Sequence, residues 1–262
     1  MTISPNKWEL DVQGYLNVCN ISAATPRQQI RDFAKGVNDL GLWNSMVCWP
    51  LRSSQNAATG DIMYSLGGLG AFNGTMVNTP TRGADGMTFT AANLHHITTS
   101  LDVQNLRQFT AMVAANQTSQ VSAADTMMAA WGTVTTTNYF ILRKTAANVF
   151  NALSRSASAT RQTSISGGGI AAGSWFMHGW GTQGANMVPT ISGTAGASIA
   201  FLPEETGSVT LSIGILAPPS NSPYNGTIAS AMFFKDAELT TAQQLLVYNL
   251  YKETLGTGLT LP

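Results

Sequence analysis

The stretch "YNGTIASAMFFKDAELTTAQQLLVYNLYKETLG", residues Tyr224 to Gly256, decides the fold because its hydrophobic period changes partway along. Its first part, 226–234, is apolar at consecutive positions, which is typical of a central strand covered on both faces. The second part has apolar residues at helical spacing, namely Leu246, Val247, Leu250 and Tyr251. We therefore expect a buried strand followed by a helix that packs on its sheet.

The ends of this helix are marked by local signals. Thr240 and Gln243 have the spacing of a capping box, and Gly256 is a typical residue for stopping a helix. These signals predict a helix over about 241–255.

Upstream of this stretch, short apolar or alternating segments are separated by clusters of Gly, Asn, Ser and Thr. One of them, "SVTLSIGIL", alternates so that one face carries Val209, Leu211, Ile213 and Ile215. Many short strands without helices between them favour an antiparallel sandwich over a parallel α/β sheet. The predicted class is mainly β, an antiparallel two-sheet sandwich with an N-terminal and a C-terminal helix.

The N-terminal segment contains one clear helical pattern, "TPRQQIRDFAKGVNDLG", for which we predict a helix over about 26–39. Thr25 is placed to cap it and Gln28 to complete a capping box. Its apolar stripe includes the interface candidates Ile30, Phe33 and Val37. We divide the chain into a docking or interface segment, 1–45, and the sandwich with its terminal helix, 46–262.

The closing stretch resembles the end of laminin G-like, concanavalin A-like jelly-roll domains. Tyr224 to Ile228 is similar to the family's "F-x-G-x-I" strand, and "FFKDAELTTAQQLLVYNLYKETLG" to the turn and terminal helix that follow it. The resemblance covers roughly Met87 to Gly256 in strand rhythm and is motif-specific over about the last forty residues. The resemblance implies that the two-sheet sandwich is a concanavalin A-like jelly roll.

The N-terminal helix followed by "LWNSMVCWPL" and "FNGTMVNTPTRGADGMTFT" resembles the arrangement ahead of such jelly rolls in bacteriophage virion proteins. This resemblance implies a structural protein of a phage particle.

The amino-acid composition limits the classes of partner that the chain is suited to bind. Only 10% of the residues are charged and the formal net charge is zero, which gives no basic surface for nucleic acid or an anionic membrane. From its first residues we expect no signal peptide, and we expect no membrane span because no apolar run is long enough. Cys19 and Cys48 lie in apolar contexts, for which two buried free thiols are favoured over a disulfide.

The acidic residues lack the pattern of a glycosidase, which needs two carboxylates that project from one strand. Glu9 with Asp11 lies outside the predicted sandwich, and Glu204 with Glu205 reads as a turn. We therefore expect no enzyme activity.

The candidates for a metal site are also weak. Four aspartates are isolated in loops or at strand ends, and His95 and His96 are adjacent, so in a strand they point to opposite faces. We expect no cofactor and leave open a single structural calcium bound largely by carbonyl oxygens. The aspartates are Asp61, Asp85, Asp102 and Asp125.

The segment "SWFMHGW" offers the candidate ligand contacts. Phe176, His178 and Trp180 share one face of a strand, with Trp175 and Met177 on the other. If the first face is open to solvent, these side chains are suited to stack on a sugar and hydrogen-bond to it. The favoured alternative is that both faces belong to the core or to a subunit interface.

Two functions from different classes follow. The leading one is a non-enzymatic phage virion protein, a capsid decoration, head-fibre or tail-fibre component that forms a homo-oligomer, contacts other virion proteins and contributes to host glycan attachment. This protein would be located in the virion. The alternative is a carbohydrate-binding module or lectin whose main role is sugar recognition.

Overall fold

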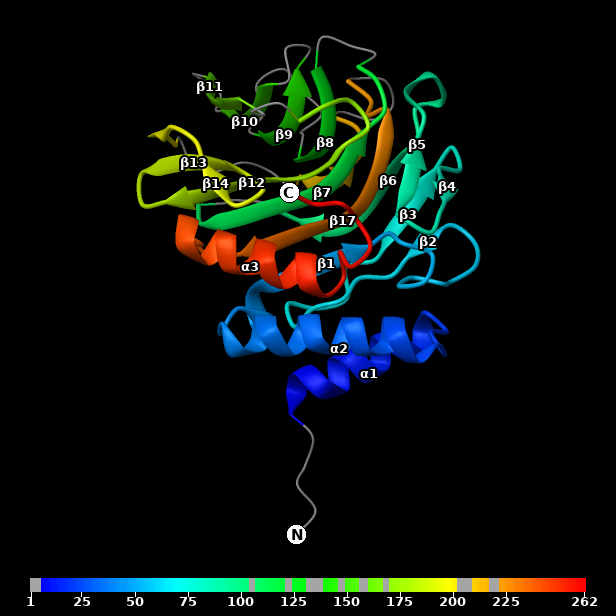
Figure 1. Cartoon of the computed structure of the whole chain (residues 1–262). Coiled ribbons are helices and arrows are strands. Elements are labelled where there is room, and N and C mark those ends of the chain that lie inside the picture. The colour runs from blue at the N-terminus through cyan, green and yellow to red at the C-terminus, as the bar shows by residue number, and fades with distance from the viewer. Residues whose placement is uncertain are drawn as a thin grey trace.

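The computed structural model describes residues 6–103, 107–120, 124–130, 139–145, 149–155, 160–166, 170–201, 209–216 and 222–262. In these residues two antiparallel sheets face each other, as the sequence predicts (Figure 1). The first, sheet A, has nine strands with the central order β14-β13-β12-β7-β17-β5-β4, while β1 also pairs with β17 and β15 with β13. Its strands are β1 (Met46–Pro50), β4 (Thr81–Arg82), β5 (Met87–Phe89), β7 (Phe109–Gln117), β12 (Trp175–Gln183), β13 (Asn186–Ile191), β14 (Thr194–Ala195), β15 (Ile199–Ala200) and β17 (Gly226–Lys235).

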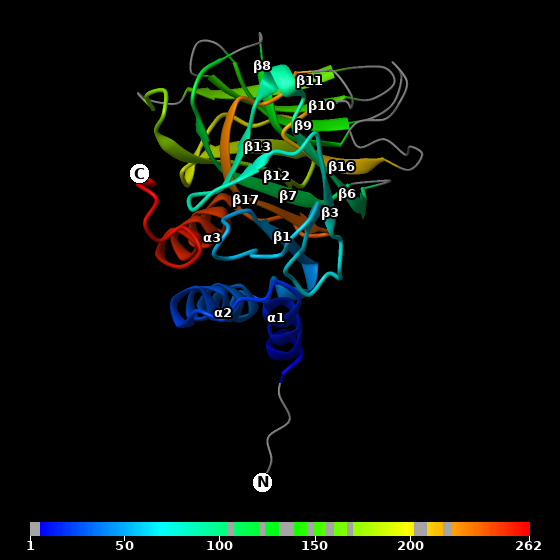
Figure 2. The same ribbon diagram turned by 90° about the vertical axis from the view of Figure 1, so that its right-hand side faces the viewer.

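The second sheet, sheet B, has eight strands in the order β11-β10-β9-β8-β16-β6-β3-β2. Figure 2 shows the two sheets as the layers of a sandwich. The strands are β2 (Ile62–Met63), β3 (Gly74–Val77), β6 (His96–Asp102), β8 (Ala124–Ala130), β9 (Tyr139–Thr145), β10 (Val149–Arg155), β11 (Thr160–Ser166) and β16 (Thr210–Ile213).

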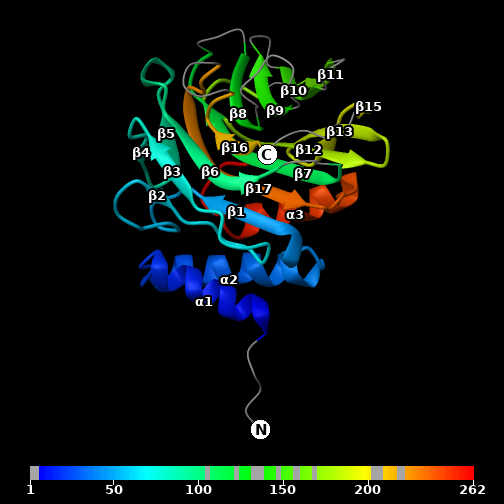
Figure 3. The same ribbon diagram turned by 180° about the vertical axis from the view of Figure 1, so that it is seen from behind.

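Within the described ranges, three α-helices lie on the outer side of sheet A (Figure 3). They are α1 (Lys7–Val18), α2 (Ala24–Asp39) and α3 (Thr241–Glu253), and two short 3₁₀ turns lie at Trp43–Ser45 and Ala91–Asn93. Among the described residues, no helix is both long and apolar enough to cross a membrane.

The N-terminal segment differs from the prediction in two ways. It contains two helices instead of one, since α1 precedes the helix expected at 26–39. The second helix begins at Ala24 without a side-chain cap, so Thr25 lies inside it and does not cap it. Helix α1 is harder to predict because it is apolar on two sides: Val12 and Leu16 are buried, while Leu10 and Val18 are exposed.

Helix α3 begins as the sequence predicts. The Thr240 side chain accepts a hydrogen bond from the backbone N–H of Gln243, and the Gln243 side chain accepts one from the Thr240 N–H. Its buried stripe differs from the prediction, because Leu246 is half exposed and Gln244 is fully buried in its place. Gln244 is accommodated because its side chain accepts a hydrogen bond from the Thr190 hydroxyl and donates one to the Leu239 carbonyl.

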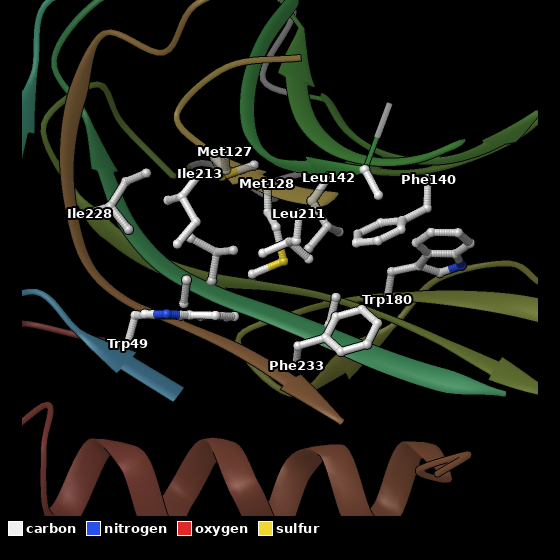
Figure 4. Packing of buried hydrophobic residues seen from close by; sticks show 14 of the residues in the cluster. Trp49, Met127, Met128, Phe140, Leu142, Trp180, Leu211, Ile213, Ile228 and Phe233 are labelled. Carbon is white, nitrogen blue, oxygen red and sulfur yellow. The ribbon is translucent and has the colours of Figure 1, made fainter. Parts of the chain in front are cut away.

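The inner core fills the space between the sheets (Figure 4). The ring of Phe109 is stacked on Phe233 at a centroid distance of 5.5 Å and meets Trp180 edge-on at 4.6 Å. A second, outer core lies between sheet A and the helices. Strand β17 serves both: Ile228, Ala231 and Phe233 face the inner core, whereas Ala229, Met232 and Phe234 face the outer one. The consecutive apolar residues of this strand are thus explained by burial on both faces.

The three interface candidates of α2 belong to the outer core. Ile30, Phe33 and Val37 have no exposed surface, and Phe33 meets Tyr251 of α3 edge-on at a centroid distance of 6.4 Å. Their burial is completed by the same chain, so in this structure they present no surface to another subunit.

Candidate functional site

The residues predicted to contact a glycan lie in the interior. Phe176, His178 and Trp180 share the inward face of β12 and have no exposed surface, so a ligand at the surface does not reach them. On the other face, Trp175 and Met177 belong to the outer core. Both faces of β12 are therefore core, which is the alternative favoured from the sequence.

The imidazole of His178 makes two polar contacts in the interior. Its Nδ1 lies 3.0 Å from the backbone oxygen of Thr190 in β13, and its Nε2 lies 3.0 Å from the backbone oxygen of Asn151 in β10. Burial lowers the pKa of His178, while the two carbonyl contacts oppose this shift. The neutral form is favoured, and the ring links a strand of sheet A to a strand of sheet B.

The outward face of sheet B differs from that of sheet A because the α-helices of the described residues lie on sheet A (Figure 1). Four polar residues on adjacent strands of this face are direct cross-strand partners. Their sequence neighbours Leu142 and Phe150 face the inner core, which places these side chains outward. We call these four residues the polar row: Thr126 of β8, Arg143 of β9, Asn151 of β10 and Ser164 of β11.

Hydrogen bonds connect the polar row. The guanidinium of Arg143 donates through Nε to Asn151 Oδ1 at 3.4 Å and through Nη2 to Gln162 Oε1 at 3.0 Å. The side chain of Asn151 in turn donates through Nδ2 to the Ser164 hydroxyl at 2.8 Å. These contacts hold a cation, two amides and a hydroxyl in fixed positions on one sheet face, which is the kind of preorganisation that reduces the entropy lost on binding.

The row is open at one end and closed at the other. Ser164 and Gln162 of the edge strand β11 are exposed and Arg143 is partly exposed, whereas Asn151 and Thr126 are buried. The Thr126 hydroxyl has no hydrogen-bond partner among the described residues. A ligand therefore has access at β11 and β9.

An apolar cluster adjoins the row on the same face. Ile141 and Leu153, one pleat along from Arg143 and Asn151, pack with Ala129 and Leu216. These four side chains are buried, so the cluster packs beside the row and offers no apolar surface to a ligand.

A second polar group lies on the inner side of the same strands. Lys144 is buried, and its Nζ lies 5.6 Å from the ring centroid of Phe150 and 5.9 Å from that of Phe176. Burial lowers the pKa of Lys144, and the charge of Asp125 opposes this shift. Asp125 accepts a hydrogen bond from the Gln117 side chain at 2.7 Å, so this group joins the two sheets across the interior.

The carboxylates considered for catalysis have structural partners where the structure describes them. Glu9 accepts a hydrogen bond from the Asn6 N–H at the start of α1, and Asp11 accepts from Lys7 Nζ and Trp43 Nε1, each at 2.9 Å. Glu204 and Glu205 lie outside the described residues.

No group of three or more His, Cys, Asp or Glu side chains suited to a metal ion occurs in the described part of the chain. His95 and His96 are both buried; His95 Nδ1 accepts from the Thr90 N–H, and His96 Nδ1 lies 2.8 Å from the Leu94 oxygen. Both imidazoles are thus engaged with local backbone.

Sequence reasoning did not single out the polar row, although part of its signal is present. In "YFILRKT" Arg143 alternates with the inward Leu142, and in "TRQTSIS" Gln162 and Ser164 alternate with the inward Ile165. What the sequence lacks is the register, because the partners lie on four strands whose pairing no local pattern specifies.

Comparison with known proteins gives no match to a family model and none to a curated protein. Among solved structures, the Trypanosoma rangeli sialidase in complex with sialic acid aligns with a TM-score of 0.61 at 10% identity, over 88% of this chain and 39% of that one. At this identity the match establishes a shared fold.

Two further solved structures contain a bound carbohydrate. Domain 4 of AbnA, an extracellular arabinanase from Geobacillus stearothermophilus, in complex with arabinotriose, aligns with a TM-score of 0.48 and 16% identity over 78% of this chain and 87% of that one. The CBM40 module of the Ruminococcus gnavus IT-sialidase, bound to α2,6-sialyllactose, aligns with a TM-score of 0.48 and 16% identity over 56% of this chain and 85% of that one. The β-sandwich fold is supported by the match to the Trypanosoma rangeli sialidase, and the virion role stays a prediction from the sequence.

Proposed function

We propose that this chain is a non-catalytic carbohydrate-binding domain and that its glycan binds at the polar row. The observation that carries this proposal is the row itself: adjacent strands place Arg143, Asn151 and Ser164 in register on a sheet face that none of the described helices covers, linked by hydrogen bonds at 2.8 to 3.4 Å. Arg143 and Ser164 are accessible to a ligand, and the buried Asn151 joins them. Sugars offer many hydroxyl groups, and amide, hydroxyl and guanidinium groups fixed in this way match them.

The charge of the chain supports an uncharged or weakly charged polar ligand in preference to a nucleic acid. Lysine and arginine together number 13, equal to aspartate and glutamate, so there is no overall positive potential that would attract a polyanion. The sialidase fold match supports the proposal by analogy of architecture only, since a fold does not specify a ligand.

A glycan array probed with the purified chain tests the proposal. We expect at least one glycan to bind above background, and Gln162→Ala to weaken that binding by about two- to tenfold because one exposed hydrogen-bonding group is lost. Arg143→Gln is expected to weaken it more, since the cation and the fixed fork of donors are both removed.

Gln13→Ala is the matched control, because Gln13 is an exposed amide on α1, far along the chain from the row. The proposal fails if no glycan binds, or if the Gln162 and Arg143 variants bind as well as the Gln13 variant. Circular dichroism of all variants confirms that each is folded.

A further inference from the structure

We propose that His178 is a positioning residue for the polar row and that it acts through the backbone carbonyl of Asn151. This inference rests on the proposed function, because it concerns how the same site is held in place.

Asn151 connects the interior of the sandwich to the site. Its backbone oxygen lies 3.0 Å from His178 Nε2 on the inner side of β10, while its side chain accepts from Arg143 and donates to Ser164 on the outer side. A shift of the β10 backbone at this residue therefore moves both side-chain contacts. Whatever fixes the Asn151 carbonyl also fixes the centre of the polar row.

The imidazole is itself firmly held. Its opposite nitrogen lies 3.0 Å from the Thr190 oxygen in β13, the Phe150 ring meets it edge-on at a centroid distance of 5.3 Å, and no part of the side chain is exposed. The ring therefore works as a rigid spacer between β13 of sheet A and β10 of sheet B.

The position of the imidazole proton decides whether His178 donates a hydrogen bond to the Asn151 carbonyl. A neutral imidazole carries one N–H, so it donates either to Thr190, which lies in its own sheet, or to Asn151, which lies in the other sheet. Only a ring protonated at Nε2 donates to Asn151. The proposed role of His178 therefore requires a proton at Nε2.

The first test is ligand-free. Nitrogen-15 NMR of the whole chain, labelled at histidine, distinguishes the Nε2–H from the Nδ1–H tautomer of His178. A protonated Nε2 supports the inference, and a neutral ring protonated only at Nδ1 overturns it.

The second test uses two variants that separate the two contacts. In His178→Gln the amide nitrogen reaches about as far as Nε2 and retains a donor for Asn151, whereas in His178→Asn the shorter side chain places its amide near Nδ1 and loses that donor. The affinity is measured for the array glycan that the wild type binds most strongly. We expect the His178→Gln variant to bind it within about twofold of the wild type and the His178→Asn variant to bind it about tenfold more weakly. Trp180→Phe, a change on the same buried face of β12, is the packing control and is expected to leave the affinity nearly unchanged.

The outcomes separate this inference from the proposed function. If no glycan binds the wild type, the proposed function fails. The role of His178 is then judged by its tautomer and by the NMR signals of Arg143 Nε and Asn151 Nδ2. These signals should shift in the His178→Asn variant and stay in place in the His178→Gln variant. If the Asn variant keeps both the affinity and these signals, or if the Gln and Asn variants lose affinity equally, His178 does not position the site. Should either variant fail to fold, the tautomer of the wild type still decides.

Discussion

Cys48 illustrates how a single side chain takes its chemistry from its burial. It lies in β1 with no exposed surface, and its Sγ lies 3.3 Å from the Ser230 hydroxyl of β17. Burial raises the pKa of this thiol to about 12, and the same cause raises that of Cys19 to about 12. Both thiols are free, as favoured from the sequence, because the chain has a large core that needs no covalent cross-link.

We predict that neither thiol reacts with iodoacetamide in the native protein at pH 8. The thiolate is the reactive form, and with a pKa of about 12 its fraction at pH 8 is about one in ten thousand, in addition to the steric protection. Mass spectrometry after timed alkylation should show no modified cysteine in the native chain and two in the denatured chain. Rapid labelling of the native protein would contradict the burial of Cys19 and Cys48.

At the scale of the element, the glycine in the closing motif has a packing reason. A Cβ at Gly226, the first residue of β17, would lie 2.3 Å from the backbone oxygen of Asn116 in the neighbouring strand β7. Backbone cannot give way as a flexible side chain can, so only glycine allows these strands to approach this closely.

Gly226→Ala is therefore predicted to lower the free energy of unfolding by about 1–3 kcal/mol, the usual cost of forcing extra volume into packed structure. Gly14→Ala is the matched control: a Cβ at this position in α1 meets nothing within 4 Å, so the change should stabilise the helix by about 0.5–1 kcal/mol. Urea unfolding of both variants measures the difference, and equal effects would contradict the close approach of β17 and β7.

The elements also show which features a sequence can predict. The period and cap of 224–256 correctly predict β17 and the start of α3, because both signals are local. The burial of Gln244 in place of Leu246 depends on a hydroxyl of β13, which no helical pattern encodes. The candidate site could not be predicted for a related reason: its residues are brought together by strand register, and the aromatic residues chosen from "SWFMHGW" are used to fill the interior.

At the scale of the whole molecule, the two cores share sheet A as a common wall. Phe233 and Phe234 are adjacent in β17, yet the first packs in the inner core and the second in the outer core, with α2 and α3 beyond it. The helices therefore cover an apolar sheet face that water would otherwise contact, and the burial of that face contributes to the stability of the strands themselves.

This arrangement predicts that damage to the helical layer destabilises the sandwich. Phe33→Ala removes a fully buried ring of α2 that packs against Tyr251 of α3, and a cost of about 3–5 kcal/mol is expected from the lost contacts and the cavity. If the two cores unfold as one unit, hydrogen exchange measured by mass spectrometry should accelerate at the amides of β7 and β17 as well as in α2. Asp32→Ala, an exposed change on the same helix, should leave these rates nearly unchanged. Faster exchange confined to α1 and α2 would instead show that the helical layer opens independently, and that sheet A retains its structure without it.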